Sequence, residues 1–352
     1  MVNLPPCQDT PAAWHGPELA ARTEDWTGHL TQTHVDEIDA ALRGAMALHG
    51  DNIAAISADD FPLPTLGPVL LSLRDSLING CGFTLIRDLP LDKFTPRQVA
   101  TLFYGIGSHI GSARSQNAMG HVLGHVRDIG KSGDDMNARI YQTSERQTFH
   151  TDSADVVALI CLRQSKSGGE SLLVSAETIF NEFLKRRPDL LARLFDPIAT
   201  DRRGEVPEGM KPFFEIPVYS WFAERLTVMY QRQYIDSAQR FDGALRLSPE
   251  HVEALDLFDQ LANDPKLHLS MRLEPGDMQF VYNHAMLHDR NGFEDWPEPE
   301  RCRHLLRLWL SVPGDRPLPD CFKERFGATQ IGDRGGILVP GTKLTVPLEE
   351  LG

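Results

Sequence analysis

The chain has 352 residues, of which 41% are hydrophobic, and its 49 acidic residues against 35 lysines and arginines give a formal net charge of −14. This length and composition are typical of a globular protein with a substantial core, and the negative charge repels phosphate backbones and anionic lipid, which excludes nucleic acid as an expected partner. Five scattered cysteines without a Cys-x-x-Cys pair predict neither a disulfide framework nor a zinc knuckle.

The amino-terminal segment gives no sign of export. Residues Met1 to Trp14 contain no basic residue and no apolar run, and the chain holds no stretch of 18 uninterrupted apolar residues. Neither a secretory signal nor a membrane-spanning helix is therefore expected. Together with reduced thiols, this pattern favours a cytoplasmic protein that does not bind membranes.

The first third of the chain reads as a flank followed by a helix-strand-helix unit. Residues 1–60 are expected to be irregular apart from one helix at Val35–Leu48, where apolar residues recur at helical spacing. An apolar helical pattern at Leu66–Asn79 then leads into a strand-like run at Phe83–Arg87. A second helix is predicted at Pro96–Gly107.

From His121 onward, short runs of strand-forming residues alternate with turn residues, a pattern that favours a sandwich or barrel. The predicted strands are Val122–Ile129, Ala138–Gln142, Val156–Leu162, Ser171–Val174, His268–Leu273, Asp277–Tyr282 and His304–Val312. A mixed segment at about 176–265 interrupts them. Its predicted helices are Ala176–Arg186 and Pro249–Asn263, and its strand candidates are Phe213–Tyr219 and Leu226–Gln231. Because no repeat and no Gly/Ser linker is present, we expect one domain at 61–352 with this segment as an insertion.

One of several His-x-acid patterns has the geometry of a metal site. The residue counts predict about two such matches by chance, and the chain has four. Those at His34 and His251 lie in or beside helical patterns, where residues two apart point to nearly opposite faces, and the one at His49 marks a helix end at a glycine. Only His150 and Asp152 lie at the end of a β-type run, where positions i and i+2 share a face. We therefore predict that these two side chains bind one metal ion.

A third ligand is expected downstream, because two imidazoles and one carboxylate form the facial triad that leaves three adjacent coordination positions open in oxygen-activating ferrous enzymes. The best context is the segment Asn283–Arg290, which contains both His284 and His288. On a helix, their spacing of four would put both histidines on one face and favour a zinc-like pair instead. The segment lacks the glutamate of a His-Glu-x-x-His motif, and the residues alone leave both histidines as candidates.

Four separated blocks carry a resemblance to a known family. They are Phe149-His150-Thr151-Asp152, Ser167-Gly168-Gly169-Glu170-Ser171-Leu172, Asn283 through Asp295, and Arg303-His304-Leu305-Leu306-Arg307-Leu308-Trp309-Leu310. The chain resembles the taurine-dioxygenase-like family of iron(II)/2-oxoglutarate oxygenases, which includes enzymes similar to clavaminate synthase, over about Val69 to Val312. The resemblance implies a double-stranded β-helix, a distorted jelly-roll barrel with packed helices, and it implies His288 as the third ligand.

The resemblance also implies Fe(II), 2-oxoglutarate as co-substrate, and O2. In the family, an arginine after the distal histidine pairs with the distal carboxylate of 2-oxoglutarate and a hydroxyl assists it, and these positions resemble Arg303 and Ser171. A planar guanidinium can grip a carboxylate with two parallel hydrogen bonds. Arg307 shares a strand face with Arg303, and burying two cations is costly unless anions receive them.

The distal block departs from the family pattern. Asp289 follows His288 where relatives often have glycine, and fifteen residues separate His288 from Arg303, slightly more than in some relatives. Arg301, Arg303 and Arg307 therefore all stay candidates for the co-substrate carboxylate, and the Arg-His-Leu-Leu-Arg context favours Arg303.

The expected activity is oxidation, chiefly hydroxylation, of a small-molecule substrate that is anionic or amino-acid-like, with release of succinate and CO2. The carboxylate of Asp152 favours hydroxylation, desaturation or cleavage, because halide-installing relatives lack this ligand. Two alternatives remain: a jelly-roll metalloenzyme that uses the same triad for non-oxidative chemistry, and a catalytically silent binding module, whose stability would not respond to metal.

Overall fold

Most strands belong to two sheets in the computed structural model, which describes residues 4–130, 140–339 and 341–348. The larger sheet consists, in spatial order, of β1 (Thr27–His29), β2 (Phe83–Arg87), β13 (Met278–Tyr282), β5 (Val156–Arg163), β16 (His304–Ser311) and β3 (Ser112–Arg114), with β4 (Leu123–Val126) also paired to β16. The smaller sheet consists of β12 (Leu269–Met271), β7 (Ser171–Ser175) and β14 (Met286–Arg290). All of these pairs are antiparallel except β1 with β2.

Three further antiparallel pairs form separate two-stranded sheets. They are β6 (Ser167–Gly168) with β15 (Phe293–Glu294), β8 (Ile198–Asp201) with β9 (Phe213–Ile216), and β10 (Tyr219–Phe222) with β11 (Arg225–Val228). The last two pairs belong to the segment between β7 and β12, so the predicted insertion contributes strands that are separate from the two main sheets.

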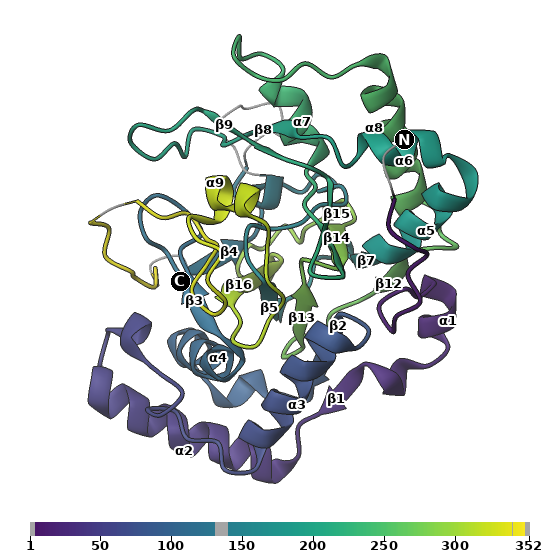
Figure 1. Cartoon of the computed structure of the whole chain (residues 1–352). Helices are drawn as coiled ribbons and strands as arrows, with labels where there is room; N and C mark the ends of the chain where they lie inside the picture. Colours follow the sequence, from purple (N-terminus) through teal and green to yellow (C-terminus); the bar gives the residue numbers. More distant parts are fainter. Residues whose placement is uncertain (1–3, 131–139, 340, 349–352) are drawn as a thin grey trace.

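Helices cover the outside of both sheets (Figure 1). They are α1 (Gly16–Ala20), α2 (Gln32–His49), α3 (Leu66–Asn79), α4 (Pro96–Ile110), α5 (Ala176–Arg186), α6 (Pro188–Arg193), α7 (Arg232–Ala238), α8 (Pro249–Ala262) and α9 (Lys323–Phe326). Helices α3 and α4 pack against the larger sheet, and α5, α6 and α8 pack together near β7.

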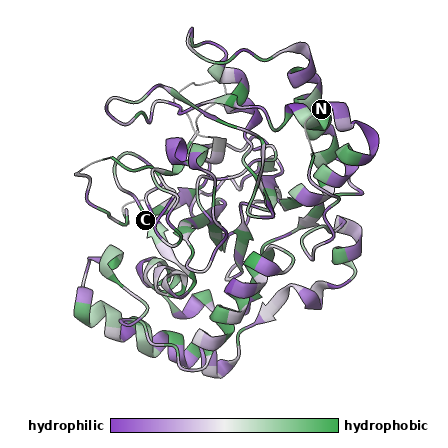
Figure 2. Cartoon of the chain, in the orientation of Figure 1, coloured by the Kyte–Doolittle hydropathy of each residue, from purple (hydrophilic) through white to green (hydrophobic). Residues whose placement is uncertain are grey.

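The apolar side chains separate into two main clusters. One fills the space between the larger sheet and helices α2 to α4, and the other lies between the smaller sheet and helices α5, α6 and α8. Figure 2 shows hydrophobic and hydrophilic residues alternating along the outer helices, as expected for helices with one buried face. Each sheet therefore has an apolar core on its outer side, and the polar site described below lies between the sheets.

Local sequence signals explain why the long helices start where they do. Helix α4 has proline in its first turn and a capping box, in which Thr95 Oγ1 accepts from the backbone N–H of Gln98 and Gln98 Oε1 accepts from the N–H of Thr95. At the end of β7, Ser175 caps α5 by accepting from the Thr178 N–H at 3.0 Å.

Several predicted elements are confirmed, and three are corrected. The helices at Leu66–Asn79 and Ala176–Arg186 and the strand at Phe83–Arg87 have the predicted bounds. Of the strand predicted at Ala138–Gln142, the first two residues lie outside the described part, and the rest form a 3₁₀ turn. The strand predicted at Phe213–Tyr219 is two strands with different partners, separated at Pro217, since proline cannot donate to a ladder. The third correction is β14, which no predicted strand covered.

The amino-terminal residues are integrated into the main core. Strand β1 extends the larger sheet, and the buried rings of Trp14 and Trp26 lie 5.5 Å and 5.4 Å from that of Phe83, measured between centroids. Residues 1–60 were expected to be an irregular flank, and their described part instead completes one edge of the sheet.

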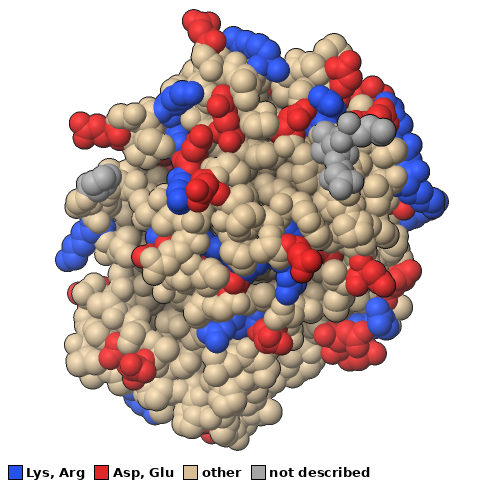
Figure 3. All heavy atoms as spheres, viewed as in Figure 1, with Lys and Arg blue, Asp and Glu red and all other residues tan. Residues whose placement is uncertain are grey.

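In the described part of the chain, no helix is long and apolar enough to span a membrane. Figure 3 shows acidic and basic side chains intermixed over the visible face.

Candidate active site

His150 and His288 lie side by side because their backbones form a β-bridge. The N–H of each residue donates to the carbonyl of the other at 3.0 Å. A reciprocal pair of this kind directs both side chains to the same face, and the two ring centroids are 4.2 Å apart. His288 lies in β14, whereas His150 lies outside the named strands, two residues after Thr148, whose φ of 61° is left-handed; the β-type run predicted before His150 is therefore only an isolated bridge at His150.

His150 offers Nε2 as the candidate ligand atom, and the side-chain amide nitrogen of Gln147 lies 3.2 Å from that Nε2. Its Nδ1 is 2.9 Å from the carbonyl oxygen of Thr148, so an Nδ1–H donor would present the Nε2 lone pair to the site. Burial lowers the pKa of His150 to about 3, and the neighbouring His288 adds to the effect. The imidazole is therefore neutral near pH 7, as metal ligation requires.

Asp152 completes a compact group of three donors. Its Oδ1 is 4.0 Å from His150 Nε2, and its Oδ2 is 3.6 Å from His288 Nε2. Two atoms that each lie about 2.1 Å from one ion are at most about 4.2 Å apart, so these separations fit a shared ion. Burial by itself would raise the pKa of Asp152, but the charge of Arg307 and the hydrogen bond with His288 hold it well below its usual value. The carboxylate is ionised, and two imidazoles with one carboxylate are the donors that suit ferrous iron.

The loop that carries Asp152 is fixed by hydrogen bonds. Trp309 Nε1 donates to Asp152 Oδ2 at 2.7 Å, and Arg307 Nη1 lies 3.5 Å from the same oxygen. Asn283 Oδ1 accepts from the Asp152 N–H at 3.0 Å, while its Nδ2 donates to the carbonyl of Ala154 at 3.0 Å. The side chain and the backbone of the carboxylate ligand are therefore both held from β16 and from the turn before β14.

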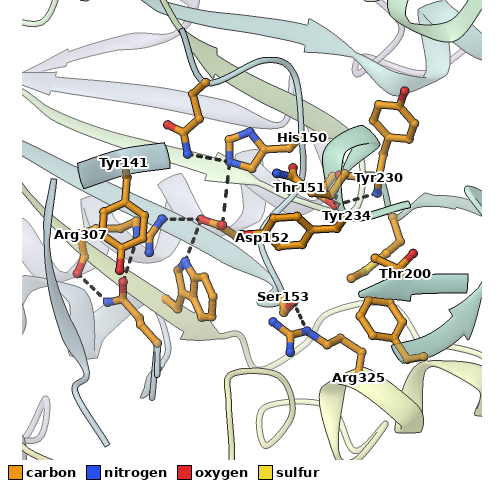
Figure 4. Close-up of a pocket in the computed structure, with 16 residues that line it drawn as sticks. Tyr141, His150, Thr151, Asp152, Ser153, Thr200, Tyr230, Tyr234, Arg307 and Arg325 are labelled. Carbon is orange, nitrogen blue, oxygen red and sulfur yellow. Dashed lines mark hydrogen bonds and ion pairs between the residues drawn. The ribbon is translucent and has the colours of Figure 1, made fainter. Parts of the chain in front are cut away.

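One cavity opens on the side of the three donors that faces the insertion (Figure 4). It contains roughly 700 Å³ of space, its open mouth included. Its walls carry aromatic, hydroxyl and amide groups together with two arginines, Arg307 from β16 and Arg325 from α9. Arg325 Nε donates to Ser153 Oγ at 2.6 Å, and its guanidinium lies over the ring of Phe214. Asp152 is the one carboxylate among the described lining residues.

A second cavity, of roughly 530 Å³ with its mouth, lies between the two sheets and is bounded by His288, Ser171 and Arg303. Arg307 and Tyr141 border both cavities. Arg307 lies in β16 and Arg303 directly precedes this strand, and both residues line the second cavity, as the predicted sharing of a face requires.

Arg303 enters this cavity as a buried cation. Only 6% of the residue is exposed, and its Nη1 has no hydrogen-bond partner in the described residues. Burial lowers the pKa of Arg303 to about 10. The close approach depends on Gly169, where φ is +77° and an added Cβ would lie 3.1 Å from Arg303 Nε. Gly169 thus has a role at the site as well as in the turn, whereas Gly168 allows the close approach of the Gly292 backbone.

Arg290 was not predicted as a site residue. It lies on β14, two residues after His288, and lines the same cavity. Its Nη2 donates to the carbonyl of Thr143 at 3.1 Å, while Nε and Nη1 find no partner among the described residues. Burial lowers the pKa of Arg290 to about 9, and the charge of Arg303 adds to the effect. The alternation of side chains along a strand, with His288 and Arg290 on one face, would have identified it, had β14 been predicted.

Ser171 also faces the second cavity. Its hydroxyl donates to Gln279 Oε1 at 3.0 Å, so the hydroxyl is oriented by a buried neighbour on β13. Ser171, Arg303 and His288, predicted from different blocks, are therefore brought to one cavity, while the alternative Arg301 is half exposed and stacks on Trp296.

His284, the alternative third ligand, lies in a different cluster. Its Nε2 is 2.8 Å from Asp155 Oδ1 and 3.7 Å from Asp315 Oδ2. Arg334, which is fully buried, donates from Nε to Asp155 Oδ1 at 2.7 Å and from Nη2 to Asp315 Oδ2 at 2.8 Å. The hydrogen bonds of His284 and Arg334 outweigh the effect of burial and lower the pKa of Asp155. A guanidinium thus occupies the place that an ion would need.

The remaining His-x-acid matches have ordinary structural roles. His34 and His251 occupy the third position of capping boxes, and the Nδ1 of each accepts a backbone N–H at 3.2 Å. His49 ends α2 beside Gly50 and lies 3.2 Å from Asp60. The prediction that these three matches belong to helices and a helix end is confirmed.

Comparison with known proteins identifies the family. The family model described as "Taurine catabolism dioxygenase TauD, TfdA family" matches residues 46–309. The chain is 35% identical to FR-33289 synthase from Streptomyces rubellomurinus over 266 residues, which are 73% of this chain and 77% of that protein. It is 32% identical to the taurine hydroxylase-like protein SAT17 from Stachybotrys chartarum over 321 residues, which are 86% of this chain and 81% of that one.

Solved structures share the fold at low sequence identity. An asparagine oxygenase complex with Fe(II), 3-hydroxyasparagine and succinate has a TM-score of 0.63 and 16% identity, and the match covers 81% of this chain and 93% of that one. The non-heme iron oxygenase OrfP with Fe, succinate and 3-hydroxyarginine has a TM-score of 0.61 and 14% identity over 81% and 94% of the two chains.

Proposed function

This chain belongs to the TauD, TfdA family and is an Fe(II)- and 2-oxoglutarate-dependent dioxygenase of small molecules, and from that premise we propose that His150, Asp152 and His288 hold its ferrous ion. The convergence of three donors of the right type where two cavities meet carries the proposal. When bound, the ion, 2-oxoglutarate and O2 would together supply the oxidising power for a substrate C–H bond, and 2-oxoglutarate would be converted to succinate and CO2.

We propose that the second cavity receives 2-oxoglutarate. Arg303 is suited to the distal carboxylate, because its buried guanidinium has an Nη1 donor that no described residue satisfies. Ser171 supplies a hydroxyl on the same wall, and Arg290 adds a second cation. A dicarboxylate would neutralise charges whose burial is otherwise unfavourable.

Arg307 serves the substrate side in this proposal. It borders both cavities, yet its Nε donates to Gln116 Oε1 at 2.8 Å and its Nη1 faces Asp152. A cation fixed in this way beside the metal ligands can orient an anionic group of the substrate without competing with Arg303 for the co-substrate.

The substrate is accordingly a small anion or an amino acid. Among the described lining residues, Arg307 and Arg325 give the first cavity two guanidinium groups, and Asp152 contributes the one carboxylate. The asparagine oxygenase and OrfP structures hold hydroxylated amino acids, which supports hydroxylation of a carboxylate-bearing substrate. Aromatic side chains such as Tyr230 and Tyr234 would enclose its apolar part (Figure 4).

The arrangement of the two main sheets supports the proposal of a double-stranded β-helix. Strands β5, β13 and β16 of the larger sheet and β7 and β14 of the smaller one contribute residues to the cavity between them. In this arrangement the outer apolar clusters stabilise both walls, and the 61–352 segment forms one domain with 176–265 as an insertion.

Anaerobic absorption spectroscopy tests the proposed function. Addition of Fe(II) and 2-oxoglutarate to the purified protein should give a weak visible charge-transfer band, which the Asp152→Ala variant should lack. Arg303→Gln should require a higher 2-oxoglutarate concentration to reach the same absorbance. A band of equal intensity in Asp152→Ala would refute the ligand assignment, and an unchanged 2-oxoglutarate dependence in Arg303→Gln would refute the co-substrate assignment.

A further inference from the structure

The carboxylate of Asp152 has a neutral hydrogen-bond donor, Trp309, which lines the first cavity and to which the proposed function assigns no role. Trp309 Nε1 donates to its Oδ2 at 2.7 Å, the shortest described contact of that oxygen, and the residue is 5% exposed. The backbone of Trp309 is fixed on both sides, because β16 pairs there with Val157 of β5 and with Arg114 of β3. The donor therefore has little freedom to follow a moving carboxylate.

We propose that Trp309 is a positioning residue for the metal ligand Asp152, an inference that rests on the proposed function of the triad. By donating to Oδ2, which also lies 3.6 Å from His288 Nε2, the indole fixes the rotation of the carboxylate and holds Oδ1 4.0 Å from His150 Nε2. Loss of a residue that hydrogen-bonds to a metal-ligating group typically lowers metal affinity or activity about 10- to 100-fold.

Arg307 does not duplicate this function. Its Nη1 lies 3.5 Å from Asp152 Oδ2, at the limit of a hydrogen bond. Its Nε is engaged by Gln116, and its guanidinium lies over the rings of Tyr141 and Trp309 at 4.7 Å and 5.0 Å. An indole N–H is a donor only and stays protonated at all accessible pH values. Trp309 therefore orients Asp152 independently of pH and of any anion that binds Arg307.

The test compares two buried tryptophans. Trp309→Phe removes the indole N–H and keeps an aromatic ring beside Arg307. Trp14→Phe is a matched control, because Trp14 is also 5% exposed and its Nε1 donates to the carbonyl of Cys81 at 2.8 Å, in the core near β2. Each variant loses one buried hydrogen bond, so thermal stability should fall by similar amounts. Anaerobic Mn(II) titration followed by electron paramagnetic resonance then measures metal affinity without turnover.

We expect Trp309→Phe to weaken Mn(II) binding about 10- to 100-fold, while Trp14→Phe binds Mn(II) like the wild-type protein. Equal or tighter binding by Trp309→Phe would overturn the positioning role, and so would an equal loss in both variants. If wild-type protein and Asp152→Ala bind Mn(II) alike, the triad assignment itself fails. The two failures are therefore distinguishable.

Discussion

Two groups of histidine and carboxylate side chains lie close together in the chain and differ in their surroundings. Asp152 and His288 belong to the triad, whereas Asp155 and His284, three and four residues away, belong to the other cluster. In the second cluster, Arg334 donates hydrogen bonds to the carboxylates of both Asp155 and Asp315. In the triad, the donors face two cavities.

Ligand type and spacing are therefore insufficient to define a metal site. Both groups have the right atoms within 4.8 Å of one another. The cation brought by the carboxyl-terminal segment makes one group a structural ion network, and the open space beside the other makes it a candidate reaction centre.

Loss of a triad carboxylate should have the largest effect on activity. We expect Asp152→Ala to reduce 2-oxoglutarate-dependent succinate release to background, because the facial triad loses its one anionic ligand. The matched variant Asp155→Asn changes the other cluster and should retain metal binding in the folded fraction. Succinate release by Asp152→Ala at the wild-type rate would contradict the assignment.

Loss of Arg334 should have the largest effect on stability. Arg334→Met leaves Asp155 and Asp315 buried without their cation, and the free energy of unfolding should fall by about 3–5 kcal/mol. Urea denaturation of the metal-free protein measures the change. A loss below about 1 kcal/mol would mean that the buried network does not depend on this guanidinium.

Loss of Arg303 should have the opposite effect on stability. Its cation is buried with an Nη1 that has no partner in the described residues, so Arg303→Met should leave the metal-free protein as stable as wild type or more stable. The affinity for 2-oxoglutarate should fall by about 2–5 kcal/mol, or about 30-fold at least. Calorimetric titration with Mn(II) present gives the affinity, and wild-type affinity in this variant would exclude Arg303 as the carboxylate partner.

Acid should destabilise the metal-free protein through His150. Its pKa is about 3 when folded and about 6.5 when unfolded, so the unfolded chain binds more protons between these values. This contribution to stability is present above pH 6.5 and is lost as the pH falls towards 3, by at most about 1.4 kcal/mol per pH unit. Urea denaturation between pH 7 and 5 should show that the free energy of unfolding depends less on pH in His150→Gln than in the wild-type protein. The same pH dependence in both proteins would contradict the assignment of this effect to His150.

The smallest expected effects come from two serines. Ser171→Ala should weaken 2-oxoglutarate binding by about 1 kcal/mol, or about fivefold, because a neutral hydroxyl is lost from the cavity. Ser311→Ala removes a hydroxyl that donates to Asp155 at 3.1 Å and should lower stability by about 1 kcal/mol without changing 2-oxoglutarate affinity. If Ser311→Ala weakened 2-oxoglutarate binding and Ser171→Ala did not, the co-substrate would have to bind outside the second cavity.

Sequence alone predicted the elements whose pattern is local. Helices α3 and α5 and strand β2 follow from periodicity and flanking turn residues. His150 and Asp152 were singled out because only their pattern ended a β-type run. In contrast, β14 was missed because Met286–Arg290 contains two charged residues and follows a turn, so its strand character comes from pairing with β7.

The parts of the site that could not be predicted from the sequence depend on contacts between residues far apart in the chain. Arg334 reaches Asp155 across 179 positions, and Trp309 reaches Asp152 across 157. No periodicity or spacing rule encodes such pairs, which arise when β16 and the carboxyl-terminal segment pack beside the 150–155 loop. For the same reason Arg290 became a candidate only once β14 was placed.

The most direct test of the triad is an anomalous-diffraction measurement. Crystals grown anaerobically with Fe(II) and 2-oxoglutarate should show, in data collected at the iron absorption edge, one strong anomalous peak between His150, Asp152 and His288. A peak between Asp155, His284 and Asp315, or a fully loaded protein without a peak at the triad, would contradict the assignment.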